Sequence, residues 1–209
     1  MISDVTGILL AGGRSRRMGQ DKRFLSVGEE SLLNRSQRVL RSVFSRVYIV
    51  IAQDSENLDA EVPVLRDIVP GCGSLGGLFT GLKNSETSHV FLASCDMPFL
   101  SPKVIQFLVT QKESVDIVIV RNDEGLQSTH ALYSRKCLPI IADMIHRGRL
   151  RIRDLMNHPD LCVRVIEGKE IESIEPLSQS FMNVNTPADL ERAQGQTITG
   201  GPCRHSMEP

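Results

Sequence analysis

The residues best suited to chemistry lie near the N-terminus, in the stretch GILLAGGRSRRMGQDK that runs from Gly7 to Lys22. An apolar run ends there at the glycine pair Gly12-Gly13, and a basic loop follows. Adjacent glycines let backbone N–H groups turn outward and approach a ligand closely, and an anion is the usual guest of such a concave backbone. The loop therefore predicts a phosphate site, with a nucleotide as the natural ligand. Its basic residues are Arg14, Arg16, Arg17 and Lys22.

Two familiar phosphate-binding patterns can be excluded by counting along this loop. Gly12, Gly13 and Gly19 do not make G-x-G-x-x-G, and no glycine is followed by Lys-Ser or Lys-Thr. Neither the dinucleotide fingerprint nor the P-loop is therefore present. The plain structural alternative is a surface turn, rich in glycine and arginine, that happens to follow a strand.

Two carboxylates follow later apolar runs, where strands are expected to end. Asp67 comes after the short segment 62–65, and Asp96 comes after HVFLAS at 89–94. Open α/β sheets bind ligands outside the carboxyl ends of their strands. A carboxylate there suits Mg²⁺, a hard cation that prefers carboxylate and phosphate oxygens. A turn-forming or capping role is the alternative for each residue.

The elements that must position these residues alternate along the chain. Near-continuous apolar runs indicate strands buried on both faces, and apolar residues at helical spacing indicate amphipathic helices. This alternation predicts an α/β fold, a three-layer αβα sandwich with a mainly parallel, Rossmann-like sheet. The predicted strands are 5–10, 24–27, 46–52, 62–65, 89–94, 115–121, an antiparallel strand 129–133, and 161–166. The predicted helices begin after the cap Ser31, span 75–82, 102–111 and 136–146, and begin again after the cap Thr186.

Two local features need a specific explanation. The helix over 75–82 starts with Gly76-Gly77, which predicts a flexible first turn and a close approach of the backbone to a ligand. The segment 147–153, RGRLRIR, is the densest positive patch of the chain. It is compatible with a second phosphate site or with an ordinary solvated helix face.

Composition limits the class of protein. The chain has 209 residues, 41% hydrophobic and 23% charged, with a net charge of −1. These values predict one globular domain over 1–195 followed by a mobile tail over 196–209, and they give no case for a nucleic-acid or membrane surface. The absence of a long apolar segment or hydrophobic leader predicts a cytoplasmic protein. Five cysteines without a C-x-x-C pair predict reduced thiols.

The ordered pattern L-A-G-G-x-S-x-R-M-G-x-D-K over 10–22 resembles the signature of nucleotidyltransferases that share the glycosyltransferase-A-like fold. The chain is most similar to the molybdenum cofactor guanylyltransferases, through this loop, the Ser74-Leu75-Gly76-Gly77 segment and the Asn-x-Asn-Thr-Pro pattern at 183–187. The resemblance implies transfer of GMP from GTP to the phosphate of molybdopterin or Mo-molybdopterin, with Mg²⁺ as cofactor. It also implies transient contacts with molybdenum insertion proteins or molybdoenzyme chaperones.

The resemblance assigns roles to individual residues. The implied catalytic residues are Lys22, Arg17 and Asp96, with Asp96 as the metal ligand. The implied GTP-binding residues are Leu10, Ala11, Gly12, Gly13, Lys22, Asp67, Gly76 and Asp96, with Asp67 reading the base. The implied acceptor-binding residues are Asn183, Asn185, Arg149 and Arg151. No protein nucleophile is required, because the acceptor phosphate attacks the α-phosphorus of GTP directly.

Two other functions remain open at this point. A cytidylyltransferase or a sugar-phosphate nucleotidyltransferase would have the same fold with another base or acceptor. A non-catalytic GTP-binding module would keep the loop without turnover, although the presence of Lys22 and Asp96 argues against it.

Overall fold

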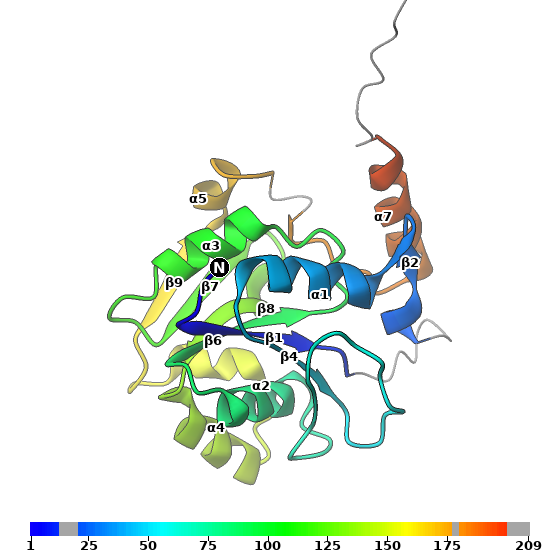
Figure 1. Ribbon diagram of the computed structural model, residues 1–209. Coiled ribbons are helices and arrows are strands. Elements are labelled where there is room, and N and C mark those ends of the chain that lie inside the picture. The colour runs from blue at the N-terminus through cyan, green and yellow to red at the C-terminus, as the bar shows by residue number, and fades with distance from the viewer. Residues whose placement is uncertain (13–20, 177–179, 200–209) are drawn as a thin grey trace, which may run out of the picture.

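The computed structural model describes residues 1–12, 21–176 and 180–199 (Figure 1). The strands are β1 (Val5–Leu10), β2 (Ser26–Val27), β3 (Glu30–Ser31), β4 (Val47–Ile51), β5 (Val64–Arg66), β6 (His89–Ser94), β7 (Ile117–Asn122), β8 (Gly125–Ser134) and β9 (Val163–Glu167). The α-helices are α1 (Leu32–Val43), α2 (Gly73–Asn84), α3 (Pro102–Thr110), α4 (Cys137–His146), α5 (Gly168–Glu172) and α7 (Pro187–Thr199), and the 3₁₀ helices are η1 (Lys22–Phe24) and η2 (Ile152–Asn157).

A seven-stranded sheet in the order β5-β4-β1-β6-β8-β7-β9 forms the centre of the molecule. β8 pairs antiparallel with β6 and β7, and the other pairs are parallel. The predicted mainly parallel sheet is confirmed, and so is the antiparallel strand predicted over 129–133, although β8 begins earlier, at Gly125. β1 is buried along its whole length, as its continuous apolar run indicated.

Helices cover both faces of the sheet, which confirms the three-layer sandwich (Figure 1). α1 and α3 pack on one face, and α2 and α4 pack on the other, each through an apolar stripe. Ser31 caps α1 by accepting a hydrogen bond from the Asn34 N–H at 3.2 Å, as the sequence predicted. Ser101 caps α3 in the same way, through the Val104 N–H.

The strand order creates a switch point between β1 and β6. From β1 the chain moves outward to β4 and β5, and it then crosses back to place β6 on the other side of β1. Ligands of open α/β sheets bind at such a point, because the two halves of the chain diverge there and leave a crevice. The edge where β1 and β6 end is therefore the natural place for a site.

The glycines of α2 have a different role from the one expected. The helix begins at Gly73 rather than at Leu75, so Gly76 and Gly77 lie inside it, and the predicted flexible first turn is wrong. A Cβ on Gly77 would stand 2.5 Å from Leu10 Cδ2. Glycine is needed there because α2 lies directly against β1.

Two further boundaries differ from expectation. Phe24 belongs to the 3₁₀ turn η1, so the strand predicted over 24–27 is reduced to Ser26–Val27, which pairs with Glu30–Ser31 in a small hairpin. α7 continues to Thr199 and so enters the segment expected to be the tail. α7 packs against the β2–β3 hairpin in a small cluster that contains Val27, Val184 and Ala193.

Two expectations about the whole chain can be compared with the described residues. Within 1–12, 21–176 and 180–199, no helix has the length and apolar character needed to cross a bilayer. Four of the five cysteines are described, and all four are free thiols: Cys72, Cys95, Cys137 and Cys162.

Candidate active site

Gly12 and Asp96 leave the sheet side by side. Leu10 pairs with Ser94 in the parallel register of β1 and β6, and the Cys95 N–H donates to the Leu10 carbonyl at 3.0 Å. Each candidate residue lies the same distance beyond its strand, so both emerge at the same edge. A Cβ on Gly12 would stand 2.8 Å from the Ala52 backbone nitrogen, which explains why the turn after β1 requires glycine.

The loop that follows Gly12 is only partly within the described residues. Gly13 and Arg17, predicted to hold GTP phosphates, lie outside them, and Lys22 starts η1 with its side chain outside the description. Leu10 and Ala11 are buried at the end of β1. The predicted phosphate contacts of this loop therefore remain predictions.

Arg23 anchors the chain where it leaves the loop. Its Nε donates to both Asp21 carboxylate oxygens, at 3.0 and 2.9 Å, and only 12% of its side chain is exposed. The hydrogen bond from Arg23 lowers the pKa of Asp21, and Asp21 in turn raises the pKa of Arg23. Cys95, the neighbour of Asp96, raises the pKa of Arg23 as well.

Asp67 follows β5 and is half-buried next to the start of α2. Its N–H donates to the Ile51 carbonyl at 2.9 Å, which continues the pairing of β4 with β5. Burial raises the pKa of Asp67, and a hydrogen bond from the Thr80 hydroxyl at 3.2 Å opposes this shift. A Cβ on Gly76 would stand 3.8 Å from Asp67 Oδ2, so the two predicted GTP-binding residues are neighbours.

Asn183 and Asn185 flank a backbone contact with Asp96. The Val184 N–H between them donates to the Asp96 carbonyl at 2.8 Å. Asp189 then fixes the end of this segment, since its Oδ2 accepts from the Asn185 and Thr186 N–H groups at 3.0 and 2.8 Å. The Thr186 side chain and these backbone donors lower the pKa of Asp189 to about 2.

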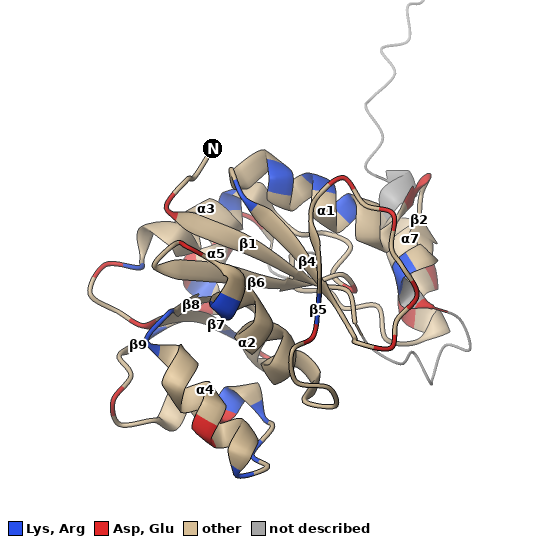
Figure 2. Ribbon diagram, turned by 60° about the horizontal axis from the view of Figure 1, so that its bottom comes forward, with Lys and Arg blue, Asp and Glu red and all other residues tan. Residues whose placement is uncertain are grey.

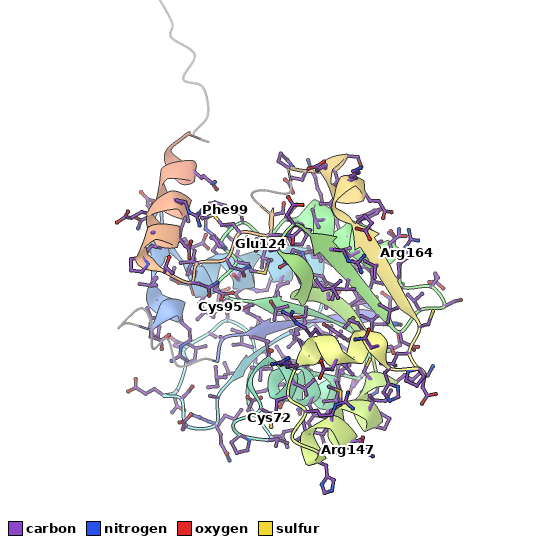
Figure 3. All side chains as sticks on the ribbon, turned by 180° about the vertical axis from the view of Figure 1, so that it is seen from behind. Cys72, Cys95, Phe99, Glu124, Arg147 and Arg164 are labelled. Atoms are coloured by element: carbon purple, nitrogen blue, oxygen red, sulfur yellow. The ribbon has the colours of Figure 1, made fainter. Side chains whose placement is uncertain are left out.

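A groove of about 1,090 Å³ opens from this segment. Asn183 and Asn185 line it together with the turn at Asp123-Glu124 and parts of α5 and α7. Cys95, Phe99 and Glu124 are labelled on the same side of the molecule in Figure 3, where α7 also lies. The groove therefore adjoins the edge at which Asp96 emerges, and it is large enough for a second substrate.

The arginine segment lies elsewhere. Arg149 lines a separate cavity of about 470 Å³ with Asp154, Asn157 and His158. Arg147 forms an ion pair with Asp143 on α4, and charged residues of both signs colour this end of the helix in Figure 2. Figure 3 shows Arg147 well apart from Cys95. The described residues thus bring Asn183 and Asn185 to Asp96, but show no such contact for Arg149 or Arg151.

Asp96 offers a cation one carboxylate at this edge of the sheet. In the part of the chain that the structure describes, no three His, Cys, Asp or Glu side chains cluster in a way that could hold a metal. A single carboxylate that completes its coordination with phosphate oxygens and water is how Mg²⁺ is usually held with nucleotides.

Some site residues had no clear signal in the sequence. Thr80 orients Asp67, and Asp189 orients the segment at Asn185. Arg23 holds Asp21 where the chain leaves the loop. Of these, only Asp189 could have been found, because Thr186 and Asp189 have the spacing of a helix-capping box.

A glycine turn and a carboxylate follow adjacent strands at the switch point of a three-layer sandwich, which is where α/β proteins of this class bind their ligands. Comparison with known proteins narrows this class. Residues 7–162 match the family model described as the MobA-like NTP transferase domain. The chain therefore belongs to the MobA-like NTP transferase family.

Individual relatives agree with this assignment. The chain is 33% identical over 189 residues to a probable molybdenum cofactor guanylyltransferase of Pelotomaculum thermopropionicum, covering 90% of this chain and 91% of that one. It is 34% identical over 198 residues to the molybdenum cofactor guanylyltransferase of Desulfosudis oleivorans, covering 94% and 97%. The crystal structure of molybdopterin-guanine dinucleotide biosynthesis protein A from Archaeoglobus fulgidus superposes with a TM-score of 0.81 at 23% identity, covering 93% and 99%, and so shares the fold.

Proposed function

We propose that this protein transfers GMP from GTP to the phosphate of molybdopterin, or of Mo-molybdopterin, and releases pyrophosphate. The observation that carries the proposal is the register of β1 and β6, by which Gly12 and Asp96 emerge together at the switch point. The names of relatives that are 33% and 34% identical over most of the chain support the choice of substrates.

The GTP half of the site would extend from β1 to β5. The loop from Leu10 to Gly13, with Lys22 and Arg17, would hold the β- and γ-phosphates and stabilise the charge that grows on the leaving pyrophosphate. Asp67 would receive the base beside Gly76. A carboxylate only accepts hydrogen bonds, and guanine presents N1–H and N2–H donors on one edge, so this pairing favours guanine over adenine.

Asp96 would hold Mg²⁺ together with the phosphates. The cation would neutralise phosphate charge in the transition state. The role of Asp96 is then to keep one negative oxygen donor at the sheet edge, and the backbone bond from Val184 to the Asp96 carbonyl restrains that turn.

The acceptor would lie in the groove beside Asn183 and Asn185. One oxygen of its phosphate attacks the α-phosphorus, the bond from the α-phosphorus to the bridging oxygen breaks, and pyrophosphate leaves with that electron pair. The amide side chains would orient the acceptor, because positioning contributes a large share of phosphoryl-transfer rates. Arg149 and Arg151 remain a second, separate proposal for the acceptor phosphate. The transient contacts with insertion proteins or chaperones remain a prediction.

The experiment is an assay of pyrophosphate release by the pure protein with GTP, ATP, CTP or UTP, Mg²⁺ and molybdopterin. We expect release that requires both GTP and molybdopterin. Equal rates with CTP would favour a cytidylyltransferase, and release that requires a sugar phosphate would favour that class. Binding of GTP without release under any acceptor would identify a non-catalytic module and overturn the proposal.

A further inference from the structure

Thr80 is a buried polar residue in the middle of α2, and the reaction as described above does not use it. Its side chain has no exposed area. Buried hydroxyl groups need partners, since desolvation without a hydrogen bond is costly. The Thr80 hydroxyl accepts from the Ile68 N–H at 3.0 Å and donates to Asp67 Oδ1 at 3.2 Å.

The two bonds fix the Asp67 side chain relative to its own backbone. A hydroxyl has one proton to donate, so the donation to Oδ1 uses it fully. The same hydroxyl accepts a hydrogen bond from the Ile68 N–H, so Thr80 also holds the peptide that follows Asp67. Thr80 thus ties the end of β5 to α2 through one oxygen of Asp67 and leaves the other oxygen for a different partner.

The remaining oxygen, Oδ2, lies on the side of Gly76. It stands 3.8 Å from the position of a Cβ on Gly76, and that Cβ would also stand 2.9 Å from Cys72 Cβ and 3.2 Å from the Val69 carbonyl oxygen, so only glycine lets the helix backbone lie this close to Asp67. Within the described residues Oδ2 accepts no hydrogen bond, and it is not one of the oxygens that are buried without a partner. One acceptor is therefore engaged by the fold, and one is presented beside the start of α2.

We propose that Thr80 is a positioning residue for base selection: it holds the Asp67 carboxylate so that Oδ2 accepts from the 2-amino edge of guanine. This inference rests on the proposed function, because it requires a guanine nucleotide beside Asp67. Thr80 never touches the nucleotide. Without the Thr80 hydroxyl, the Asp67 carboxylate can rotate and the Ile68 N–H loses its hydrogen-bond partner.

The experiment compares GTP with ITP, which lacks the 2-amino group of guanine, as substrates of the wild type and of Thr80→Val. The substitution keeps the shape of the side chain and removes both hydrogen bonds. We expect the KM for GTP to rise about tenfold, the KM for ITP to change little, and kcat at saturating nucleotide to stay near the wild-type value, as loss of one charge-assisted bond implies. Thr80→Ser keeps the hydroxyl and should restore the preference for GTP.

Thr87→Val is the matched control. Thr87 belongs to another buried hydroxyl cluster, in which it contacts Thr6 and Ser85 at 2.9 and 2.8 Å. This cluster lies where β1 and β6 begin, at the opposite end of these strands from Asp96. The Thr87→Val substitution should lower the melting temperature without changing the ratio of the KM for GTP to the KM for ITP. If Thr80→Val does not fold, Thr80→Ala removes the same bonds and places the strongest helix-forming residue in α2.

The outcomes separate this inference from the proposed function. A wild type that uses GTP and ITP equally would show that the 2-amino group is not read, which overturns both the base-reading role of Asp67 and the role of Thr80. A wild-type preference that survives intact in both Thr80→Val and Thr80→Ala would overturn only the role of Thr80. Loss of preference in Thr80→Ser, which keeps the hydroxyl, would also count against it.

Discussion

Asp96 and Gly12 show how single residues acquire a role from the strand that carries them. Each follows a buried parallel strand, and the two strands are hydrogen-bonded neighbours. In the proposed mechanism, the glycine would leave backbone N–H groups accessible to an anion, and the carboxylate would attract the cation that accompanies a triphosphate. A glycine or an aspartate after a strand is common in proteins. The two residues at the ends of neighbouring parallel strands form a more specific arrangement.

Asp96→Asn is the sharpest test at this scale. The substitution keeps the shape of the side chain and removes its charge, so we expect the single-turnover rate of GMP transfer to fall by about 10²–10³. Partial recovery at high Mg²⁺ or with Mn²⁺ is expected, because an amide oxygen still coordinates a metal. Asp143→Asn, on the exposed face of α4, is the control and should be neutral. A near-native rate with unchanged metal dependence would place the cation elsewhere.

The acceptor residues can be distinguished by kinetics. Asn185→Ala should raise the acceptor KM by about tenfold through loss of one polar contact, with the GTP KM unchanged.

The arginine proposal is tested by the double charge reversal Arg149→Glu, Arg151→Glu. An effect of the reversal on the acceptor KM would support a phosphate site there, and no effect would make that segment an ordinary solvated surface.

At the scale of elements, α2 is positioned by glycines that let it approach β1. A Cβ on Gly81 would stand 2.9 Å from two side-chain carbons of Ile8, and a β-branched side chain buried in the sheet cannot easily rotate away. The close approach carries Thr80 toward Asp67 and the start of α2 toward the end of β5. Helix packing therefore sets the position of Asp67, and with it the geometry of the proposed base site.

Gly81→Ala should destabilise the protein. Overpacking costs about 1–3 kcal/mol, which exceeds the gain of about 0.5–1 kcal/mol that alanine brings to a helix interior. Gly195→Ala in α7 is the matched control, because nothing lies within 4 Å of its added Cβ, and it should stabilise slightly. Urea unfolding measures both free energies. A Gly81→Ala variant as stable as Gly195→Ala would mean that α2 moves away from β1 without cost.

At the scale of the whole molecule, His130 couples folding to pH. The ring is fully buried on β8, in contact with Phe91 and Phe181 at centroid distances of 5.3 and 4.7 Å. Neither ring nitrogen has a hydrogen-bond partner in the described residues. Burial lowers the pKa of His130 to about 3, from 6.5 in an exposed chain.

The sign of the effect follows from linkage. Between pH 6.5 and about 3 the unfolded chain binds a proton that the folded protein does not, so the free energy of unfolding decreases as the pH falls. The full slope from this group is about 1.4 kcal/mol per pH unit. His130→Leu should remove this part of the slope, measured by chemical denaturation at several pH values. His146→Gln, at an exposed position, is the control. An unchanged slope in His130→Leu would show that His130 does not couple folding to pH.

The sequence alone determined the nature of the elements and of the first site residues. Apolar periodicity is a local property, so β1, β6, α1 and α3 could be located from it, and the loop after β1 could be identified by its ordered glycines and basic residues. Asp96 could be selected because it directly follows a predicted buried strand. The family resemblance also depended only on residue order.

Only the tertiary structure decided how these residues meet. The pairing of Leu10 with Ser94, the bond from Val184 to Asp96 and the bond from Thr80 to Asp67 join residues far apart in the sequence, and no periodicity encodes such pairs. The flexible turn predicted at Gly76-Gly77 is wrong because a glycine has the same local signature whether it bends the chain or, as Gly77 does beside Leu10, admits a neighbouring strand. Which of the two applies depends on what packs against it, and that is a property of the folded molecule.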